Sequence, residues 1–399
     1  MIVLAGADLV LPDRVLPGGS LIIHDGRIAA IEPRAIDGPA GATRLDLAGH
    51  LVTPGFVDVH VHGVDGIDVL DGPAAVADVA ARLPRYGVTA FCPTSVACPP
   101  GVLATLLGAV AAARLATPRG SARVLPAHLE SNFINPEWNG AQPAACLRPP
   151  PGRETGVGSR ETGEFSGREI LDVIAAHGGA TGLVTLAPEL PGGIDLVRAL
   201  VAAGHRVSMG HTGATYDEAR AAIDAGASHA THLFNRMSSV SARGPGVVGA
   251  VLESDEVAAE IICDGFHVHP ANVALAVRLK SQRLAMAITD GTAGAGLPVG
   301  SRARLGGRTL IVTPHSAVLE DGTLAGSTLT MDRAFGVLID RVGLGVVDAA
   351  RLCATTPAGR LGLSGTGTLA AGNLADLVVL GPGRRVRQTF VGGVAALEP

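Results

Sequence analysis

The chain has 399 residues and a formal net charge of -5; 47% of its residues are hydrophobic and 17% are charged. This balance predicts an extensive core and excludes a disordered chain. The negative net charge argues against nucleic acid as a partner, and the 3% aromatic content argues against stacking platforms for bases. The length suits one large barrel with a smaller satellite domain.

The five cysteines are odd in number and form no Cys-x-x-Cys pair. They therefore indicate a reducing compartment and argue against a disulfide framework or a thiolate zinc site. The apolar segment Met1–Ala7 is too short for a spanning helix and lacks the basic residue that begins a signal peptide. We expect a cytoplasmic protein with no membrane partner.

Both ends of the chain carry short β patterns. Asp25-Gly26 separates the apolar runs 20–24 and 27–31, which predicts a hairpin. Two further strand-like runs, 375–380 and 389–393, lie near the other end. Because neither end has enough strands for a sandwich of its own, we expect residues 1–53 and 366–399 to build one small β-sandwich domain together. Residues 54–365 then form the central domain.

The central region alternates apolar strand-like runs with helical runs rich in Ala, Leu and Arg. The strand-like runs are 56–62, 89–93, 124–130, 183–186, 206–209, 229–232, 260–263 and 285–288. The intervening helical runs are 74–85, 102–115, 170–176, 196–203, 218–225 and 271–280, and Thr215 with Glu218 forms a capping-box pattern. Eight such strands predict an α/β fold, a (β/α)8 TIM-like barrel. A doubly wound sheet is the alternative, but no Gly-rich fingerprint follows the first strand.

One polar stretch interrupts this alternation. Residues 148–167 are rich in Gly, Pro and Arg and show no periodicity. We expect a mobile loop after the third barrel strand, on the face where barrel enzymes carry their active sites.

Chemically capable side chains end five of the predicted strands. His60 and His62 share one face of the first strand because side chains alternate along a strand. The other strand ends carry Glu130, His211, His232 and Asp290. Strand ends converge at the mouth of a barrel, so these four histidines and two carboxylates could hold one or two divalent ions such as zinc, iron, manganese or cobalt. His128 shares the face of Glu130, and either an outer-shell role or ordinary packing is open to it.

Motifs along nearly the whole chain resemble the amidohydrolase superfamily and, within it, the N-acetylglucosamine-6-phosphate deacetylase family. The matching segments are Pro54–Gly63, His128-Leu129-Glu130, Thr185–Glu189, Gly210–Tyr216, Thr231–Asn235, Asp264–Val268, Thr289-Asp290, Leu324–Leu329 and Gly367–Leu377.

This resemblance implies an amide hydrolase that removes the acetyl group from N-acetylglucosamine 6-phosphate. Glu130, His211 and His232 would bind the main metal, His60 and His62 would add a second subsite, and Asp290 would be both ligand and catalytic acid/base. Zinc is the first choice of ion. The phosphate contacts would be Asn235, Arg243 and His267, with Arg243 reaching into the neighbouring subunit of a homodimer.

The chain departs from the family pattern around the sugar and the acyl group. Ser131-Asn132 follow Glu130 where Gly-Pro is usual, and Arg236 replaces a small residue. Gln142 lies where many members have a carbonyl-polarising histidine. We therefore expect Gln142 and Arg236 among the substrate contacts. Another N-acetylated amino-sugar phosphate or sugar acid, a cyclic amide, and a non-catalytic sugar-phosphate binding protein remain alternatives.

Overall fold

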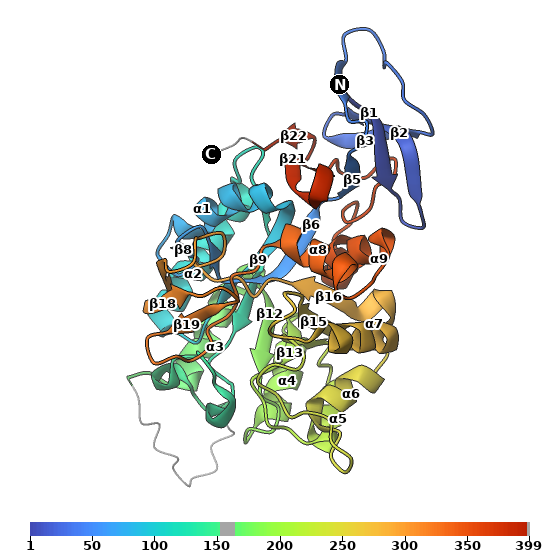
Figure 1. Ribbon diagram of the computed structural model, residues 1–399. Coiled ribbons are helices and arrows are strands. Elements are labelled where there is room, and N and C mark those ends of the chain that lie inside the picture. Colours follow the sequence, from blue (N-terminus) through green and yellow to red (C-terminus); the bar gives the residue numbers. More distant parts are fainter. Residues whose placement is uncertain (152–163, 397–399) are drawn as a thin grey trace.

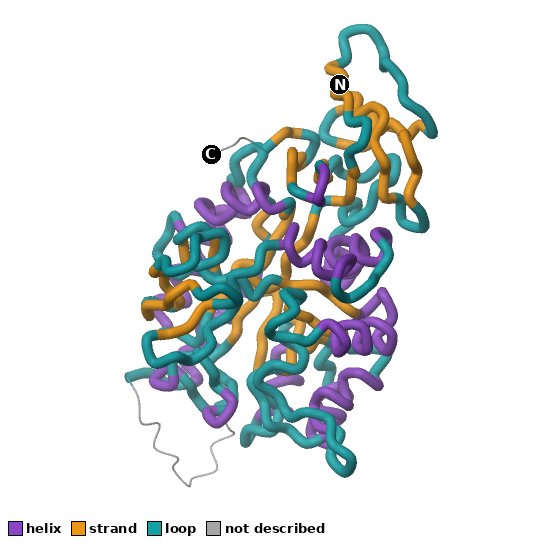
Figure 2. The backbone as a smooth tube through the Cα atoms, viewed as in Figure 1, coloured by secondary structure: helices purple, strands orange, loops and turns teal. Residues whose placement is uncertain are grey.

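The computed structural model describes residues 1–151 and 164–396, and a barrel of eight parallel strands lies at its centre (Figures 1 and 2). The strands, in ladder order, are β6 (Phe56–Val61), β9 (Val88–Ser95), β11 (Ala127–Glu130), β12 (Thr181–Leu186), β13 (Arg206–Met209), β14 (His229–Ala230), β15 (Ala258–Ile262) and β16 (Ala285–Ile288). The circle closes where the Asp290 amide donates to the His60 carbonyl at 2.9 Å. The predicted TIM-like barrel is confirmed, and the doubly wound alternative is wrong.

Helices surround these strands (Figure 2). They are α1 (Ala75–Arg82), α2 (Pro100–Leu115), α3 (Gly167–Ala176), α4 (Gly193–Ala202), α5 (Tyr216–Asp224), α6 (Gly246–Glu253), α7 (Pro270–Leu284), α8 (Met331–Asp340), α9 (Val346–Ala350) and α10 (Thr356–Leu361). A single π-helical turn, Arg351–Thr355, links the last two. The predicted capping box is confirmed, because the Thr215 side chain accepts from the Glu218 amide and the Glu218 carboxylate accepts from the Thr215 amide. The sequence did not predict α6 or the three helices after β16.

One predicted strand is divided in the structure. The run 124–130 appears as β10 (Arg123–Val124) and β11, which both pair with β9. Pro126 lies in the gap, and proline has no amide hydrogen to donate to a neighbouring strand. Of the predicted loop at 148–167, residues 152–163 lie outside the described part of the chain.

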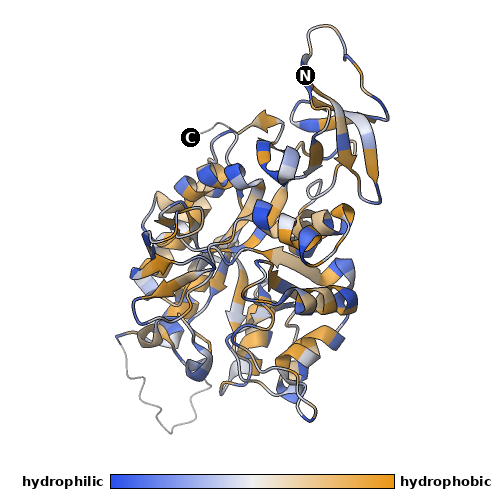
Figure 3. Cartoon of the chain, in the orientation of Figure 1, coloured by the Kyte–Doolittle hydropathy of each residue, from blue (hydrophilic) through white to orange (hydrophobic). Residues whose placement is uncertain are grey.

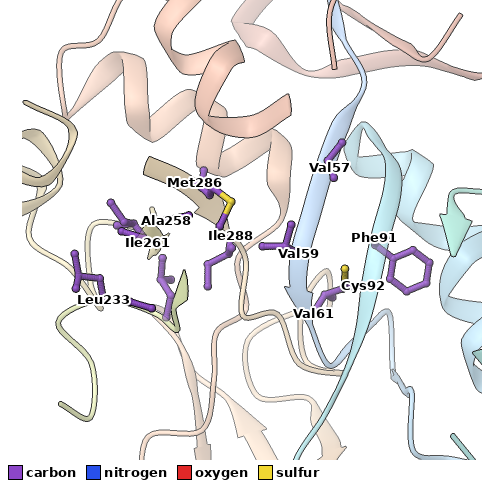
Figure 4. Packing of buried hydrophobic residues seen from close by; sticks show 14 of the residues in the cluster. Val57, Val59, Val61, Phe91, Cys92, Leu233, Ala258, Ile261, Met286 and Ile288 are labelled. Atoms are coloured by element: carbon purple, nitrogen blue, oxygen red, sulfur yellow. The ribbon is translucent and has the colours of Figure 1, made fainter. Parts of the chain in front are cut away.

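The barrel strands pack outward onto the helices through apolar side chains. Val59 of β6 lies near Met286 and Ile288 of β16, with Phe91 of β9 on the other side of β6 (Figure 4). Hydrophilic residues appear on the outer sides of helices such as α7 (Figure 3). The alternate positions of the same strands point into the barrel, which leaves that interior for polar groups.

The two ends of the chain form a separate sheet beside the barrel (Figure 1). Strands β1 (Ile2–Val10), β2 (Val15–His24), β3 (Arg27–Glu32), β4 (Thr43–Asp46), β5 (Leu51–Pro54), β20 (Leu377–Leu380), β21 (Val386–Val391) and β22 (Val394–Ala395) belong to one continuous eight-stranded sheet with its own apolar core. The Asp25-Gly26 hairpin is confirmed, with both residues at positive φ. On this basis we propose domain boundaries at 53/54 and 365/366.

A small antiparallel sheet follows β16 and was not predicted. Its strands are β17 (Arg302–Leu305), β18 (Arg308–Val312) and β19 (Ala317–Leu319). The Gly306 amide donates to Asp68 at 2.6 Å, next to the short hairpin of β7 (Gly63–Val64) and β8 (Ile67–Asp68). The Arg308 guanidinium donates to the Ala141 carbonyl at 2.7 Å, so this sheet fastens the loop that carries Gln142.

Within residues 1–151 and 164–396, no helix is both long and apolar enough to cross a membrane.

Candidate active site

Two groups of metal-ligand side chains meet at the carboxyl ends of the barrel strands. In the first group, His60 Nε2 lies 3.2 Å from His62 Nε2, and Asp290 Oδ1 lies 3.3 and 3.2 Å from these two nitrogens. In the second group, Glu130 Oε1 lies 2.8 Å from His211 Nε2 and 2.9 Å from His232 Nε2. Glu130 Oε2 is 3.6 Å from His62 Nε2, so this carboxylate stands between the two groups.

The backbone turns sharply at three of these positions. His211, His232 and Asp290 have φ values of 49°, 32° and 48°, and each follows the end of its strand by two residues. A non-glycine residue in the left-handed region costs about 1 kcal/mol or more, and such strain is typical of functional sites. These turns bring side chains from β13, β14 and β16 toward the barrel axis.

Hydrogen bonds on the far side of three imidazoles fix their tautomers. Each Nδ1 faces a group that only accepts: the Glu260 carboxylate at 3.0 Å for His60, the Thr94 carbonyl at 3.0 Å for His62, and the Trp138 carbonyl at 2.8 Å for His211. In the neutral imidazole the hydrogen therefore lies on Nδ1, so each Nε2 can direct a lone pair into the cluster when it carries no proton.

The electrostatics of the cluster favour positive charge at its centre. Burial opposes a charge on His60, yet the carboxylates of Asp290, Glu260 and Glu130 raise the pKa of His60 well above its usual value. Burial likewise favours the neutral acids, but His60 and His62 hold the pKa of Asp290 far below its usual range. His211 and His232 similarly lower the pKa of Glu130.

These residues fit a divalent cation. Converging imidazole lone pairs and ionised carboxylates repel one another unless positive charge lies between them, and imidazole with carboxylate is a ligand set typical of zinc and neighbouring metals. Both groups satisfy the distance requirement for holding an ion: His60, His62 and Asp290, and Glu130, His211 and His232.

The cluster opens into a cavity that several predicted substrate contacts line. Gln142, Asn235, Arg236 and His267 all belong to this lining. Leu305 and Leu324, from the β17–β19 sheet and the segment after it, close one side. Arg243 is exposed and, within the described chain, is not part of the lining.

Gln142 is held by two hydrogen bonds. The Ala97 backbone amide donates to Gln142 Oε1 at 2.7 Å, which directs Gln142 Nε2 toward Glu130. Gln142 Nε2 then donates to Glu130 Oε2. His267 is oriented in a similar way, because Nδ1 donates to Asp264 Oδ2 at 2.6 Å and leaves Nε2 facing Ser316 at 3.4 Å. Within residues 1–151 and 164–396, the second hydrogen of the Gln142 amide has no protein acceptor, and Gln142 lines the cavity.

The other departures from the family pattern have local structural roles. The Ser131 hydroxyl donates to the Thr185 carbonyl at 2.5 Å, and the Asn132 side chain donates to two backbone carbonyls at 2.9 and 2.7 Å.

His128 does not join either ligand group: Nδ1 bonds the Val59 carbonyl at 3.1 Å and Nε2 bonds Thr185 at 2.7 Å. Burial lowers the pKa of His128 well below its usual value, so it is neutral.

Sequence reasoning missed two buried acids beneath the cluster. Asp58 on β6 accepts from the amide and hydroxyl of Thr289, and Glu260 on β15 accepts from His60. Both are fully buried. The available signal was a single acidic residue within a mostly apolar strand, because a buried charge is rarely kept without a partner.

The fold and the site together define a TIM-like barrel whose active-site side chains could hold metal ions. The amidohydrolase family model matches residues 51–396. An N-acetylgalactosamine-6-phosphate deacetylase of Escherichia coli O157:H7 is 34% identical over 400 residues, which cover 99% of each chain. An N-acetylglucosamine-6-phosphate deacetylase of Rattus norvegicus is 35% identical over 402 residues, covering 95% of this chain and 93% of the relative.

A solved structure agrees over the full length. It is a variant of the N-acetyl-D-glucosamine-6-phosphate deacetylase of Mycobacterium smegmatis in complex with N-acetyl-D-glucosamine-6-phosphate, with a TM-score of 0.86 and 32% identity, covering 100% of this chain and 99% of that chain. The chain belongs to the amidohydrolase family, which is metal-dependent, and within it to the N-acetylglucosamine-6-phosphate deacetylase family. It is a hydrolase of the N-acetyl amide bond.

Proposed function

We propose that this enzyme removes the acetyl group from N-acetylglucosamine 6-phosphate, giving glucosamine 6-phosphate and acetate. The observation that carries the proposal is the placement of a buried metal-ligand cluster and the guanidinium, imidazole and amide side chains of Arg236, His267 and Asn235 around one cavity. The metal-ligand cluster suits hydrolysis of an amide, and the side chains of Arg236, His267 and Asn235 suit an anionic end of the substrate. The full-length similarity to deacetylases of amino-sugar phosphates supports the same substrate class.

The two ligand groups would hold two ions, and the Glu130 carboxylate lies between the two groups. Zinc is the first choice because histidine and carboxylate ligands suit it, while iron, manganese and cobalt accept the same set. When bound, such an ion lowers the pKa of a coordinated water to about 7 and polarises a carbonyl oxygen. Residues of the chain supply the remaining chemistry.

Asp290 acts as the acid/base. Its carboxylate is ionised because His60 and His62 keep its pKa low, so it accepts a proton from the attacking water as the new C–O bond forms. It then delivers that proton to the amide nitrogen as the C–N bond breaks, and the amine and acetate depart. Gln142 keeps Glu130 in place and directs its second amide hydrogen toward the acyl oxygen.

The phosphate would lie between Asn235, Arg236 and His267. Guanidinium pairs with phosphate oxygens in a bidentate manner, and Arg236 reaches this end of the cavity from the same chain. Arg243 is exposed on the loop before α6. We propose that Arg243 completes the phosphate site of the neighbouring subunit in a homodimer.

The five unpaired cysteines support a cytoplasmic location.

A second substrate has specific support. The Escherichia coli relative that aligns with 99% of this chain acts on the galactosamine epimer. Arg236 and Gln142 depart from the usual pattern at the sugar and acyl ends, so either epimer, or another N-acetylated amino-sugar phosphate, fits the cavity chemistry.

The test is a substrate panel with acetate release as the measurement. N-acetylglucosamine 6-phosphate, N-acetylgalactosamine 6-phosphate and the two unphosphorylated sugars are compared by kcat/KM. We expect a 6-phosphate to exceed its unphosphorylated sugar by about 30- to 1,000-fold, the effect of losing a desolvated charge pair. Equal kcat/KM values for the phosphorylated and unphosphorylated sugars would overturn the phosphate site. The ratio of the kcat/KM values for the two phosphorylated epimers shows which one is the better substrate.

A further inference from the structure

A carboxylate that the reaction does not use lies inside the barrel. Glu260, on β15, is fully buried, and within the described chain its carboxylate accepts only one hydrogen bond, from His60 Nδ1 at 3.0 Å. Its Oε1 lies 3.8 Å from His128 Nδ1 without a hydrogen bond. A buried carboxylate with so few partners costs several kcal/mol, so an apolar residue would serve stability better here.

The contact crosses the barrel. Strand β16 lies between β15 and β6 in the ladder, so Glu260 reaches His60 through the interior rather than along the sheet. The contact fixes the hydrogen of His60 on Nδ1 and turns the Nε2 lone pair toward His62 and Asp290. A histidine whose distal N–H faces a carboxylate is a stronger metal ligand than one whose distal N–H faces a carbonyl.

The two ligand groups differ in this respect. The group of His60 and His62 has an acidic residue behind one imidazole. In the other group, His211 has only a backbone carbonyl behind it, and His232 Nδ1 has no hydrogen-bond partner in residues 1–151 and 164–396. Within the described chain, the extra carboxylate therefore makes its hydrogen bond to the first group alone.

We propose that Glu260 is a positioning residue for His60 and that its carboxylate gives the His60/His62 subsite its affinity for a second divalent cation. This inference rests on the two-ion site of the proposed function. Under this proposal Glu130, His211 and His232 bind the first ion, and Glu260 determines the affinity for the second ion.

Two substitutions in the barrel interior test the proposal. Glu260→Gln keeps the shape and an oxygen that can accept from His60, but it removes the charge. Thr185→Val is the matched control, because Thr185 is also fully buried, bonds His128 and Thr231 at 2.7 Å, and within the described chain has no hydrogen bond to His60. Metal-free protein is titrated with Co²⁺, and heat of binding and visible absorption are followed together.

We expect wild type to take up two equivalents of Co²⁺. In Glu260→Gln the first equivalent should keep its affinity within about threefold, and the second should weaken by about 10- to 100-fold, the usual effect of removing an outer carboxylate. Thr185→Val should keep both affinities while its Tm falls. His62→Ala provides the reference for a lost second subsite.

Three results would overturn the proposal: an unchanged second affinity in Glu260→Gln, equal weakening of both equivalents, or a single equivalent in wild type. If Glu260→Gln does not fold, Glu260→Ala replaces it, and an unchanged second affinity in that variant, which also lacks the carboxylate, has the same meaning. Acetate release by wild type is measured separately. Wild type that binds two ions but releases no acetate contradicts the proposed function and not the role of Glu260.

Discussion

Asp58 and Thr289 join the first and last barrel strands directly beneath the metal-ligand cluster. The Asp58 carboxylate accepts from the Thr289 amide at 3.3 Å and from the Thr289 hydroxyl at 2.5 Å. It also accepts from the His60 amide at 3.3 Å. Burial raises the pKa of Asp58 to about 6. The pair therefore sets the separation of His60 and Asp290, which belong to strands 230 residues apart in sequence.

Replacing Thr289 by Val tests this relationship. The side chain keeps its shape but loses its hydroxyl, so a buried carboxylate loses a donor and the free energy of unfolding should fall by about 1–3 kcal/mol. Because Asp290 is the next residue, its displacement should lower kcat by about 10- to 100-fold. Urea unfolding and steady-state kinetics measure the two effects.

Thr53→Val is the matched control for that prediction. Thr53 is buried on β5 and its hydroxyl donates to the Pro54 carbonyl at 3.0 Å, away from the cluster. This variant should lose about 0.5–1.5 kcal/mol of unfolding free energy and retain its kcat. Equal kcat values in both variants would show that the Asp58–Thr289 contact serves stability alone.

Asp290→Asn should fold and still bind metal but lose turnover. The amide keeps an oxygen for the cation but cannot accept a proton, and general acid–base catalysis contributes about 10²- to 10⁴-fold. We expect kcat to fall by a factor in that range at every pH, with metal content checked by elemental analysis. Activity near that of wild type, in protein that retains its metal, would rule out the acid/base role.

Mixed dimers test whether Arg243 serves the neighbouring subunit. Arg243→Ala should lose about 2–4 kcal/mol in kcat/KM, the effect of removing one charge of a desolvated pair. We expect both this variant and Asp290→Asn to be nearly inactive when each is present alone. A mixed dimer, however, pairs an intact Asp290 with an intact Arg243 from the other chain, because a two-fold interface is reciprocal.

We therefore expect refolding the two variants together at equal amounts to restore about a quarter of wild-type activity per site, since about half of the dimers are mixed and each has one complete site. Arg236→Ala is the control, because Arg236 lines the cavity of its own chain and should not be rescued by Asp290→Asn. No recovery in mixtures with Arg243→Ala would contradict the shared site.

Lys280, the only lysine of the chain, should make stability depend on pH. Its side chain on α7 is buried and its Nζ donates to the Val251 carbonyl at 2.8 Å and to the Ser254 carbonyl, at the end of α6. Burial lowers its pKa to about 8 from 10.5. Between these values the unfolded chain holds a proton that the native chain has lost, so this residue's contribution to stability rises with pH.

The measurement is the unfolding free energy of wild type minus that of Lys280→Met between pH 7 and 11. The difference should be flat below about pH 8 and rise by up to about 3 kcal/mol by pH 10.5. Subtraction is needed because burial raises the pKa of Cys92, Cys263 and Cys353. These thiols make the unfolding free energy of both proteins fall as the pH rises, and the subtraction removes that shared effect. A flat difference across the whole range would contradict the prediction.

The sequence by itself determined the order of the barrel strands and the kinds of side chain at their ends. Apolar runs of four to eight residues between helical runs are enough to predict a strand, and alternation along a strand places His60 and His62 on one face. The Asp25-Gly26 turn and the Thr215–Glu218 cap were predictable for the same reason, because each depends on residues within four positions of one another.

Only the tertiary structure decided which groups meet inside the barrel. Glu260 lies 200 positions from His60, and their contact exists because the closed sheet brings the interiors of β15 and β6 together. Histidine and aspartate are enriched among non-glycine residues at positive φ, but most of them adopt ordinary backbone conformations. The left-handed turns at His211, His232 and Asp290 are therefore not evident from the sequence. The binding of Gln142 to Glu130 likewise follows from the β17–β19 sheet that fastens its loop. Short-range backbone preferences fix the elements, whereas closure of the barrel fixes the distances and charges on which the chemistry depends.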